Sequence, residues 1–253
     1  MAFIQMNYTS KILSRKTNIT ILLPELDEQY EENNHVKYKV LFLLHGLFDD
    51  NLGWLRYTSI ENYIRGTNLA IVMPSVEHGF YTNMEYGPDY YSFVSEELPK
   101  YLSNIFPFYT DKENVFIAGN SMGGYGALKC AIKKNNHYSK VAVLSPVLDV
   151  DDFIHNYHFD GFHPEFVFGK KLQVKNTEND LYYLLNNKTK KENLPQLWIR
   201  CGKEDLLYNQ YKKFIEYFES KAIHIDCKTY SGDHTWKSWE TQTKDLIEWI
   251  LEK

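Results

Sequence analysis

The sequence predicts an α/β fold, a mostly parallel sheet of eight strands with helices on both faces. Two observations support this. Short β-rich runs alternate with amphipathic helical segments along almost all of the 253 residues. The central runs are nearly all apolar, as strands buried on both faces must be. One core can accommodate a chain of this length, so residues 1–253 are predicted to form one domain.

The predicted elements follow each other in a regular order. Eight runs are predicted to be strands: residues 3–8, 18–23, 40–44, 69–73, 115–118, 140–144, 197–201 and 225–230. The first two have no helix between them and are expected to pair antiparallel at one edge. Five segments are predicted to be helices: residues 55–65, 90–106, 123–134, 207–220 and 237–251.

One segment interrupts the alternation. Residues 149–195 contain no clear strand and are rich in His, Asn, Lys and scattered aromatic residues. An insertion after the carboxyl end of a strand lies over the ligand-binding edge of such a sheet. This segment is therefore predicted to be a small cap on the domain.

Composition excludes several classes of protein. The formal net charge is −5 and there is no long basic run, so neither nucleic acid nor an anionic membrane is expected as the main partner. No apolar run reaches the roughly 18 residues that span a bilayer, and the first residues lack a signal-peptide pattern. Cys130, Cys201 and Cys227 have no metal-site spacing and are interpreted as reduced thiols of a cytoplasmic protein. Whether the chain forms a homo-oligomer stays open.

The run from Val115 to Gly126 carries the clearest chemical signal. An apolar strand leads into Gly119, Ser121 and Gly123 in the pattern G-x-S-x-G, and a helix-forming segment follows at once. This is the pattern of a nucleophile elbow, a tight turn that exposes one serine hydroxyl at the edge of the sheet. The alternative is an ordinary glycine-rich turn, but the flanking strand and helix favour Ser121 as a nucleophile.

A serine nucleophile needs a base and an acid that orients the base. In this fold the acid and then the histidine follow the serine along the chain. His234 lies on the loop after the last predicted strand, where the base is expected. Asp205 lies on the loop after residues 197–201 and is the preferred acid. Its neighbour Glu204 is the nearest rival, and a further alternative position is offered by Asp149, Asp151 and Asp152.

An oxyanion hole needs two N–H donors. The amide of Met122, directly after the nucleophile, is the first candidate. The second is the amide of Leu47, because the strand before it ends in His45-Gly46 and the glycine lets the backbone turn toward the site. His45 itself is expected to hydrogen-bond within its loop. Candidates for the wall of the substrate pocket are His45, Gly46, Tyr81 and Tyr86, although aromatic residues there could equally serve packing.

Three histidines in the cap segment invite a metal-site hypothesis. His155 and His158 form H-x-x-H, and His163 lies nearby. The pair lacks the adjacent glutamate of an H-E-x-x-H site, and the segment is irregular. Surface or cap histidines are therefore the preferred interpretation, and no metal is predicted.

With these residues assembled, the chain resembles the esterase D family of α/β-hydrolases, and most of all its bacterial tributyrin esterase and acetyl esterase group. The matching blocks include His45-Gly46 with Trp54, Gly79-Phe80-Tyr81-Thr82, Glu96-Glu97-Leu98-Pro99, Gly119-Asn120-Ser121-Met122-Gly123-Gly124, and Gly232-Asp233-His234 with Trp236 and Trp239. The resemblance implies a carboxylic ester hydrolase with a triad of Ser121, Asp205 and His234, without metal or organic cofactor. The cap segment has no match.

The expected activity is hydrolysis of short-chain acyl esters through an acyl-serine, with a small-molecule ester as partner. Short acyl chains are expected because the cap is small and no long apolar stretch offers a chain-length tunnel. The S-formylglutathione hydrolases, which the chain also resembles, make thioester hydrolysis an alternative. Acyl transfer is a weaker alternative. A non-enzymatic binding module is disfavoured because all three triad residues are present.

Overall fold

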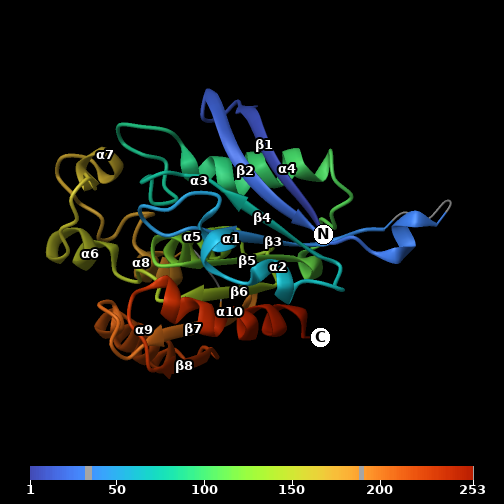
Figure 1. Ribbon diagram of the computed structural model, residues 1–253. Helices are drawn as coiled ribbons and strands as arrows, with labels where there is room; N and C mark the ends of the chain where they lie inside the picture. Colours follow the sequence, from blue (N-terminus) through green and yellow to red (C-terminus); the bar gives the residue numbers. More distant parts are fainter. Residues whose placement is uncertain (32–35, 188–190, 253) are drawn as a thin grey trace.

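The computed structural model describes residues 1–31, 36–187 and 191–252, and its centre is one eight-stranded sheet (Figure 1). Its spatial order is β1-β2-β4-β3-β5-β6-β7-β8. The strands are β1 (Ala2–Ser10), β2 (Arg15–Leu23), β3 (Lys39–Leu44), β4 (Leu69–Pro74), β5 (Val115–Asn120), β6 (Lys140–Leu144), β7 (Gln196–Gly202) and β8 (Asp226–Tyr230). All eight predicted strands are confirmed, with boundaries that move by a few residues.

The sheet is mixed, with one antiparallel edge. β1 pairs antiparallel with β2, as predicted, and β2 pairs antiparallel with β4. The remaining pairs, from β4 through β3 to β8, are parallel. Every residue of β4, β5 and β6 is buried, which explains their nearly continuous apolar sequences. The parallel strands end at one edge, where their following loops meet.

Helices cover both faces of the sheet, as predicted. They are α1 (Gly53–Tyr57), α2 (Ile60–Tyr63), α3 (Tyr90–Ser92), α4 (Leu98–Ser103), α5 (Met122–Lys133), α6 (Val150–Asn156), α7 (Pro164–Phe168), α8 (Leu181–Asn187), α9 (Tyr208–Ser220) and α10 (Trp236–Leu251). One buried cluster joins the sheet to α1, α2 and α10 through residues such as Trp54, Ile60 and Leu246. A second, on the opposite face, includes Leu128 of α5 and Phe214 of α9.

Two predicted helices are interrupted, which corrects their assignment as single helices. The segment 55–65 divides into α1 and α2 because Thr58 is extended and its hydroxyl donates to the Trp54 carbonyl (2.5 Å). The segment 90–106 contains a π-helical turn, Phe93–Glu97, between α3 and α4. Pro99 lies just after this turn and has no N–H to donate to the preceding turn. Periodicity alone did not reveal either interruption.

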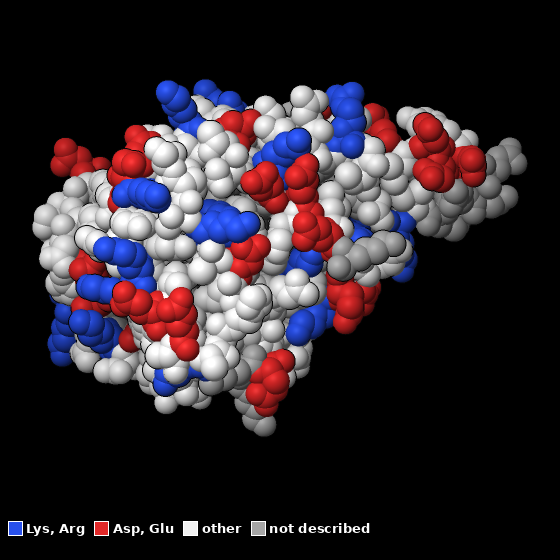
Figure 2. All heavy atoms as spheres, turned by 90° about the horizontal axis from the view of Figure 1, so that it is seen from below, with Lys and Arg blue, Asp and Glu red and all other residues white. Residues whose placement is uncertain are grey.

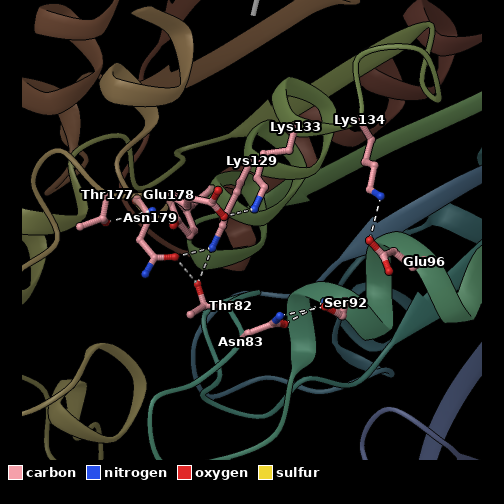
Figure 3. Close-up of polar contacts among 11 residues, drawn as sticks. Thr82, Asn83, Ser92, Glu96, Lys129, Lys133, Lys134, Thr177, Glu178 and Asn179 are labelled. Carbon is pink, nitrogen blue, oxygen red and sulfur yellow. Dashed lines mark hydrogen bonds and ion pairs between the residues drawn. The ribbon is translucent and has the colours of Figure 1, made fainter. Parts of the chain in front are cut away.

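The cap segment forms α6, α7 and α8 between β6 and β7, and residues 188–190 of it lie outside the described part of the chain. α6 and α7 lie together beyond one end of the sheet, at the left of Figure 1. A buried polar cluster fastens the cap to α5 (Figure 3). In it, Nζ of Lys129 donates to Oγ1 of Thr82 and to Oδ1 of Asn179, both at 2.6 Å. Burial lowers the pKa of Lys129 to about 7.

Charged side chains of both signs are interspersed on the face shown in Figure 2. None of the helices in the described ranges is both long enough and apolar enough to span a bilayer.

Candidate active site

Ser121 lies in a strained turn between β5 and α5. Its φ is +52°, a conformation that side-chain-bearing residues rarely adopt. The flanking glycines are required by close backbone contacts. A Cβ on Gly123 would lie 2.3 Å from the carbonyl oxygen of Leu44, and one on Gly119 would lie 2.5 Å from the backbone of Gly123. The sequence G-x-S-x-G thus lets the helix start directly against the sheet, with the serine at its N-terminus.

His234 contacts the serine from the loop that follows β8. It lies between β8 and α10, and its Nε2 is 2.9 Å from Oγ of Ser121. The following residue, Thr235, caps α10 by accepting from the amide of Ser238. The ring of Trp239 packs edge-on against the imidazole, with ring centroids 4.9 Å apart. The start of α10 and the tryptophan together fix the position of the imidazole.

Asp205 contacts the far side of the same imidazole. Both of its carboxylate oxygens are 3.0 Å from Nδ1 of His234, and its side chain is fully buried. The amide of Leu207 donates to one of these oxygens at 2.8 Å. The two loops that carry Asp205 and His234 approach closely, because a Cβ on Gly202 would lie 2.0 Å from the carbonyl oxygen of Gly232. Three residues distant in sequence are thereby joined in one hydrogen-bonded line.

Two backbone amides are the predicted donors of the oxyanion hole. Met122 is the first residue of α5, and Leu47 follows the end of β3. Within the described residues neither amide donates to a protein acceptor. The ring of His45 holds the peptide group that contains the N–H of Leu47. Its Nε2 accepts from the amide of Val76 at 3.0 Å, so its Nδ1 carries the proton and donates to the carbonyl of Gly46 at 2.8 Å.

A cleft of about 390 Å³ opens over Ser121 and His234. One side is apolar and includes residues of the cap. The other side combines a carboxylate with aromatic rings. Besides Ser121 and His234, the lining residues are Gly46, Leu47, Phe48, Asp49, Tyr57, Phe153, Phe159, Leu206, Thr235, Trp236 and Trp239.

The comparison with known protein families decides the classification, since the Esterase family model matches residues 10–248 of this chain. The chain belongs to the Esterase family. It is therefore an enzyme that hydrolyses carboxylic esters.

Three known relatives match this esterase over nearly its whole length. An acetyl esterase of Caldicellulosiruptor saccharolyticus is 28% identical over 262 residues, which is 99% of this chain and 98% of the relative. FphF, a fluorophosphonate-binding serine hydrolase of Staphylococcus aureus, is 36% identical in sequence, and its structure matches with a TM-score of 0.95. The match covers 100% of this chain and 99% of the FphF chain. The S-formylglutathione hydrolase FrmB of Staphylococcus aureus is also 36% identical, with a TM-score of 0.90 and 99% of both chains covered.

The rival acids of the esterase lie elsewhere. Glu204 points to the neighbouring loop, where its Oε2 accepts from the amide of Gly232 at 2.6 Å. The three aspartates that follow β6 contact other groups, in the cap segment and on α9. Asp149 caps α6, Asp151 contacts Lys175, and Asp152 accepts from Gln210. Asp205 is thus the one of these five carboxylates that the structure brings to His234.

The predicted pocket residues divide into two groups. Gly46 lines the cleft. His45 and Tyr81 are buried behind it, where the Tyr81 hydroxyl donates to the His45 carbonyl at 3.0 Å. Tyr86 is 54% exposed and its amide donates to the carbonyl of Phe166 in the cap. His45, Tyr81 and Tyr86 are therefore not among the residues that line this cleft, and a contact of theirs with substrate stays a prediction.

Several lining residues were missed by the sequence reasoning. Phe48 and Asp49 directly follow Leu47 in the loop after β3, and Trp236 lies two residues after His234. Closeness in sequence to Leu47 and His234 was a signal that could have identified them. Phe153 and Phe159 could not be found in this way, because they belong to the cap and reach the cleft only through the tertiary fold.

Two of the three cap histidines of the esterase contact neighbouring residues. His155 contacts the backbone carbonyl of Asp151 at 2.7 Å, and His163 lies 3.5 Å from the carboxylate of Glu165. Across the described ranges, His, Cys, Asp and Glu side chains form no group of three or more that could hold a metal ion.

Proposed function

We propose that this chain is a serine carboxylesterase that hydrolyses short-chain acyl esters through an acyl-serine intermediate. One observation carries the proposal. Ser121, His234 and Asp205 form a continuous hydrogen-bonded line, and its serine end opens into the cleft. This is the arrangement that activates a serine hydroxyl at neutral pH. No metal or organic cofactor takes part in the proposed reaction.

In the first half of the reaction, Oγ of Ser121 attacks the ester carbonyl carbon while Nε2 of His234 takes the hydroxyl proton. Asp205 holds the imidazole with its proton on Nδ1 and stabilises the imidazolium that forms. The carbonyl oxygen becomes an oxyanion between the amides of Met122 and Leu47. Each such donor contributes about 3 kcal/mol in comparable enzymes. The C–O bond then breaks, and His234 gives its proton to the departing alcohol oxygen.

In the second half, a water molecule takes the place of the alcohol. His234 removes a proton from this water as it attacks the acyl carbon, and the second tetrahedral oxyanion occupies the same two amides. The bond to Oγ of Ser121 breaks, the serine regains its proton from His234, and the carboxylic acid leaves.

The apolar side of the cleft supports a preference for short acyl chains. Phe153 and Phe159 come from the cap, their rings pack 5.7 Å apart, and Phe159 also contacts Phe48. In the proposed binding mode these rings lie where the acyl group is held and limit the room for a long chain. The relative named as an acetyl esterase supports the same preference, and the resemblance to tributyrin esterases fits it.

The test is hydrolysis of p-nitrophenyl acetate and butyrate by the wild type and by Ser121→Ala, with Ser220→Ala on the exposed end of α9 as control. We expect Ser121→Ala to lose at least a thousandfold in kcat and the control to keep its activity. If Ser121→Ala retains most of its activity, the mechanism is wrong. Failure of a fluorophosphonate probe to label Ser121 in the wild type would favour a non-enzymatic binding module instead.

Thioester hydrolysis is a second candidate because FrmB, named as an S-formylglutathione hydrolase, matches almost the whole chain. The same residues would serve both reactions. Measuring kcat/KM on S-formylglutathione and on p-nitrophenyl acetate separates them. We propose the cytoplasm as location, since the three free thiols Cys130, Cys201 and Cys227 suit a reducing compartment.

A further inference from the structure

One wall of the cleft joins a carboxylate to three aromatic rings. It consists of Asp49, Tyr57, Trp236 and Trp239, and we call it the acidic aromatic wall. Nε1 of Trp236 donates to Oδ2 of Asp49 at 3.2 Å. The rings of Tyr57 and Trp236 are stacked with centroids 5.4 Å apart, and Trp236 meets Trp239 edge-on at 5.2 Å. These contacts hold the carboxylate at a fixed place on the wall.

This wall adjoins the imidazole side of the reacting centre. Trp239 packs against His234, and Trp236 packs against Trp239. In the proposed reaction His234 gives its proton to the departing oxygen, so the alcohol part of the ester must lie next to the imidazole. The acidic aromatic wall is therefore on the side of the alcohol, and the phenylalanines of the cap are on the side of the acyl group.

Asp49 gives the wall a negative charge, and the described residues of the lining offer no lysine or arginine to pair with it. Within the described part of the chain, none of the residues that line the cleft is Lys or Arg. Burial raises the pKa of Asp49 to about 6, and the neutral indole donor does not cancel its charge, so the carboxylate is ionised at pH 7 and above. The adjacent Asp50 lies outside the lining and accepts from the amide of Leu52. Arg56, whose guanidinium lies 5.9 Å from the Tyr57 ring centroid, is exposed and outside the lining.

We propose that the acidic aromatic wall selects esters whose alcohol carries a positive charge, such as an ammonium or quaternary ammonium group. This inference rests on the proposed ester hydrolysis. The carboxylate of Asp49 attracts the cation, and the ring faces of Trp236 and Tyr57 that the stack leaves open offer the aromatic surface that such cations favour. An anionic alcohol would be repelled by the same carboxylate, which has lost part of its hydration.

The experiment uses two esters of the same shape, acetylcholine and the uncharged 3,3-dimethylbutyl acetate. The quantity of interest is the ratio of their kcat/KM values within each protein, because a change in overall catalytic power cancels in this ratio. We expect the wild type to prefer acetylcholine and Asp49→Asn to lower the ratio about tenfold. Asp50→Asn removes a charge of the same sign outside the lining and should change the ratio less than twofold.

A binding measurement separates this inference from the proposed reaction. Choline alone, titrated while tryptophan fluorescence is followed, reports on the wall without any turnover. We expect saturable binding at millimolar concentrations to the wild type, weakened about tenfold in Asp49→Asn. Equal ratios in the wild type and Asp49→Asn, with hydrolysis of both esters, would overturn the wall's role and leave the esterase function standing. Choline binding that depends on Asp49, without hydrolysis of either ester, would support the wall and refute the reaction.

Discussion

The imidazole of His45 holds the carbonyl of Gly46 by a hydrogen bond of 2.8 Å from Nδ1. That carbonyl belongs to the same planar peptide group as the N–H of Leu47. Holding the oxygen therefore also fixes the direction of the N–H. The second ring nitrogen of His45 accepts from the amide of Val76, so the loop after β3 is tied to the loop after β4. In the proposed mechanism, His45 is thus a positioning residue for the N–H of Leu47.

Replacing this ring should reduce turnover more than binding. In His45→Phe the ring volume is kept, but the peptide of Leu47 loses its fixed orientation. We expect kcat on p-nitrophenyl acetate to fall at least about tenfold with KM changed less than threefold, since the oxyanion forms only in the transition state. His78→Phe, which removes a nearby histidine that packs on Phe48, should have a much smaller effect. A loss confined to KM would contradict the positioning role.

His45 should also make the stability of the protein depend on pH. Burial lowers the pKa of His45 to about 4, below its ordinary value. Between about pH 4 and pH 6.5 the unfolded chain binds a proton that the folded protein does not, so the free energy of unfolding rises with pH there. Urea unfolding at pH 5 and pH 7 should show this rise in the wild type. In His45→Phe the rise should be smaller, and an equal rise would assign it to other groups.

The orienting acid can be tested with two adjacent carboxylates. Asp205→Asn replaces the group that holds Nδ1 of His234, and we expect kcat to fall by about 10³ to 10⁴. Glu204→Gln removes a charge next to it but can keep an oxygen for the amide of Gly232, so its effect should stay within tenfold. Single-turnover release of p-nitrophenol measures the acylation step directly. A larger loss in Glu204→Gln would move the acid to that residue.

The phenylalanines of the cap should set the acyl-chain preference. Phe159→Ala removes a ring that contacts Phe48 and Phe153 at the apolar side of the cleft. We expect the kcat/KM of p-nitrophenyl octanoate relative to the acetate to rise about tenfold, because the space released can hold additional methylene groups. Phe166→Ala, an exposed ring on α7 outside the lining, is the matched control. An unchanged ratio in Phe159→Ala would place the acyl chain elsewhere.

The buried lysine under the cap predicts a rise in stability in alkaline solution. The pKa of Lys129, lowered by burial to about 7, lies below that of an unfolded lysine near 10.4. Between these values the unfolded chain holds a proton that the folded protein has released, so raising the pH favours the folded state. The free energy of unfolding should therefore increase from pH 7 to pH 9.5 and do so less in Lys129→Met. Lys133→Met, one turn further along α5, should keep most of the wild-type increase.

Most strands and helices of the fold could be predicted from the sequence. The apolar runs of β4, β5 and β6 identified a parallel core because strands buried on both faces leave little room for polar residues. Helices α9 and α10 showed the amphipathic period that their burial requires. The breaks at Thr58 and before Pro99 were not visible, since hydrophobic period does not report hydrogen bonding of the backbone.

The candidate site divides in the same way. The sequence by itself determined Ser121, His234 and the two oxyanion amides as candidates, because strained turns and loops after strands impose local residue patterns. It favoured Asp205 as the acid but left Glu204 as a rival, because the two carboxylates are adjacent in sequence and differ in the direction they point. The tertiary structure places Asp205, and not Glu204, next to His234. It also brings Asp49 and the cap residues Phe153 and Phe159 into the lining of the cleft. Contacts between distant segments leave no local pattern, so packing alone determines them.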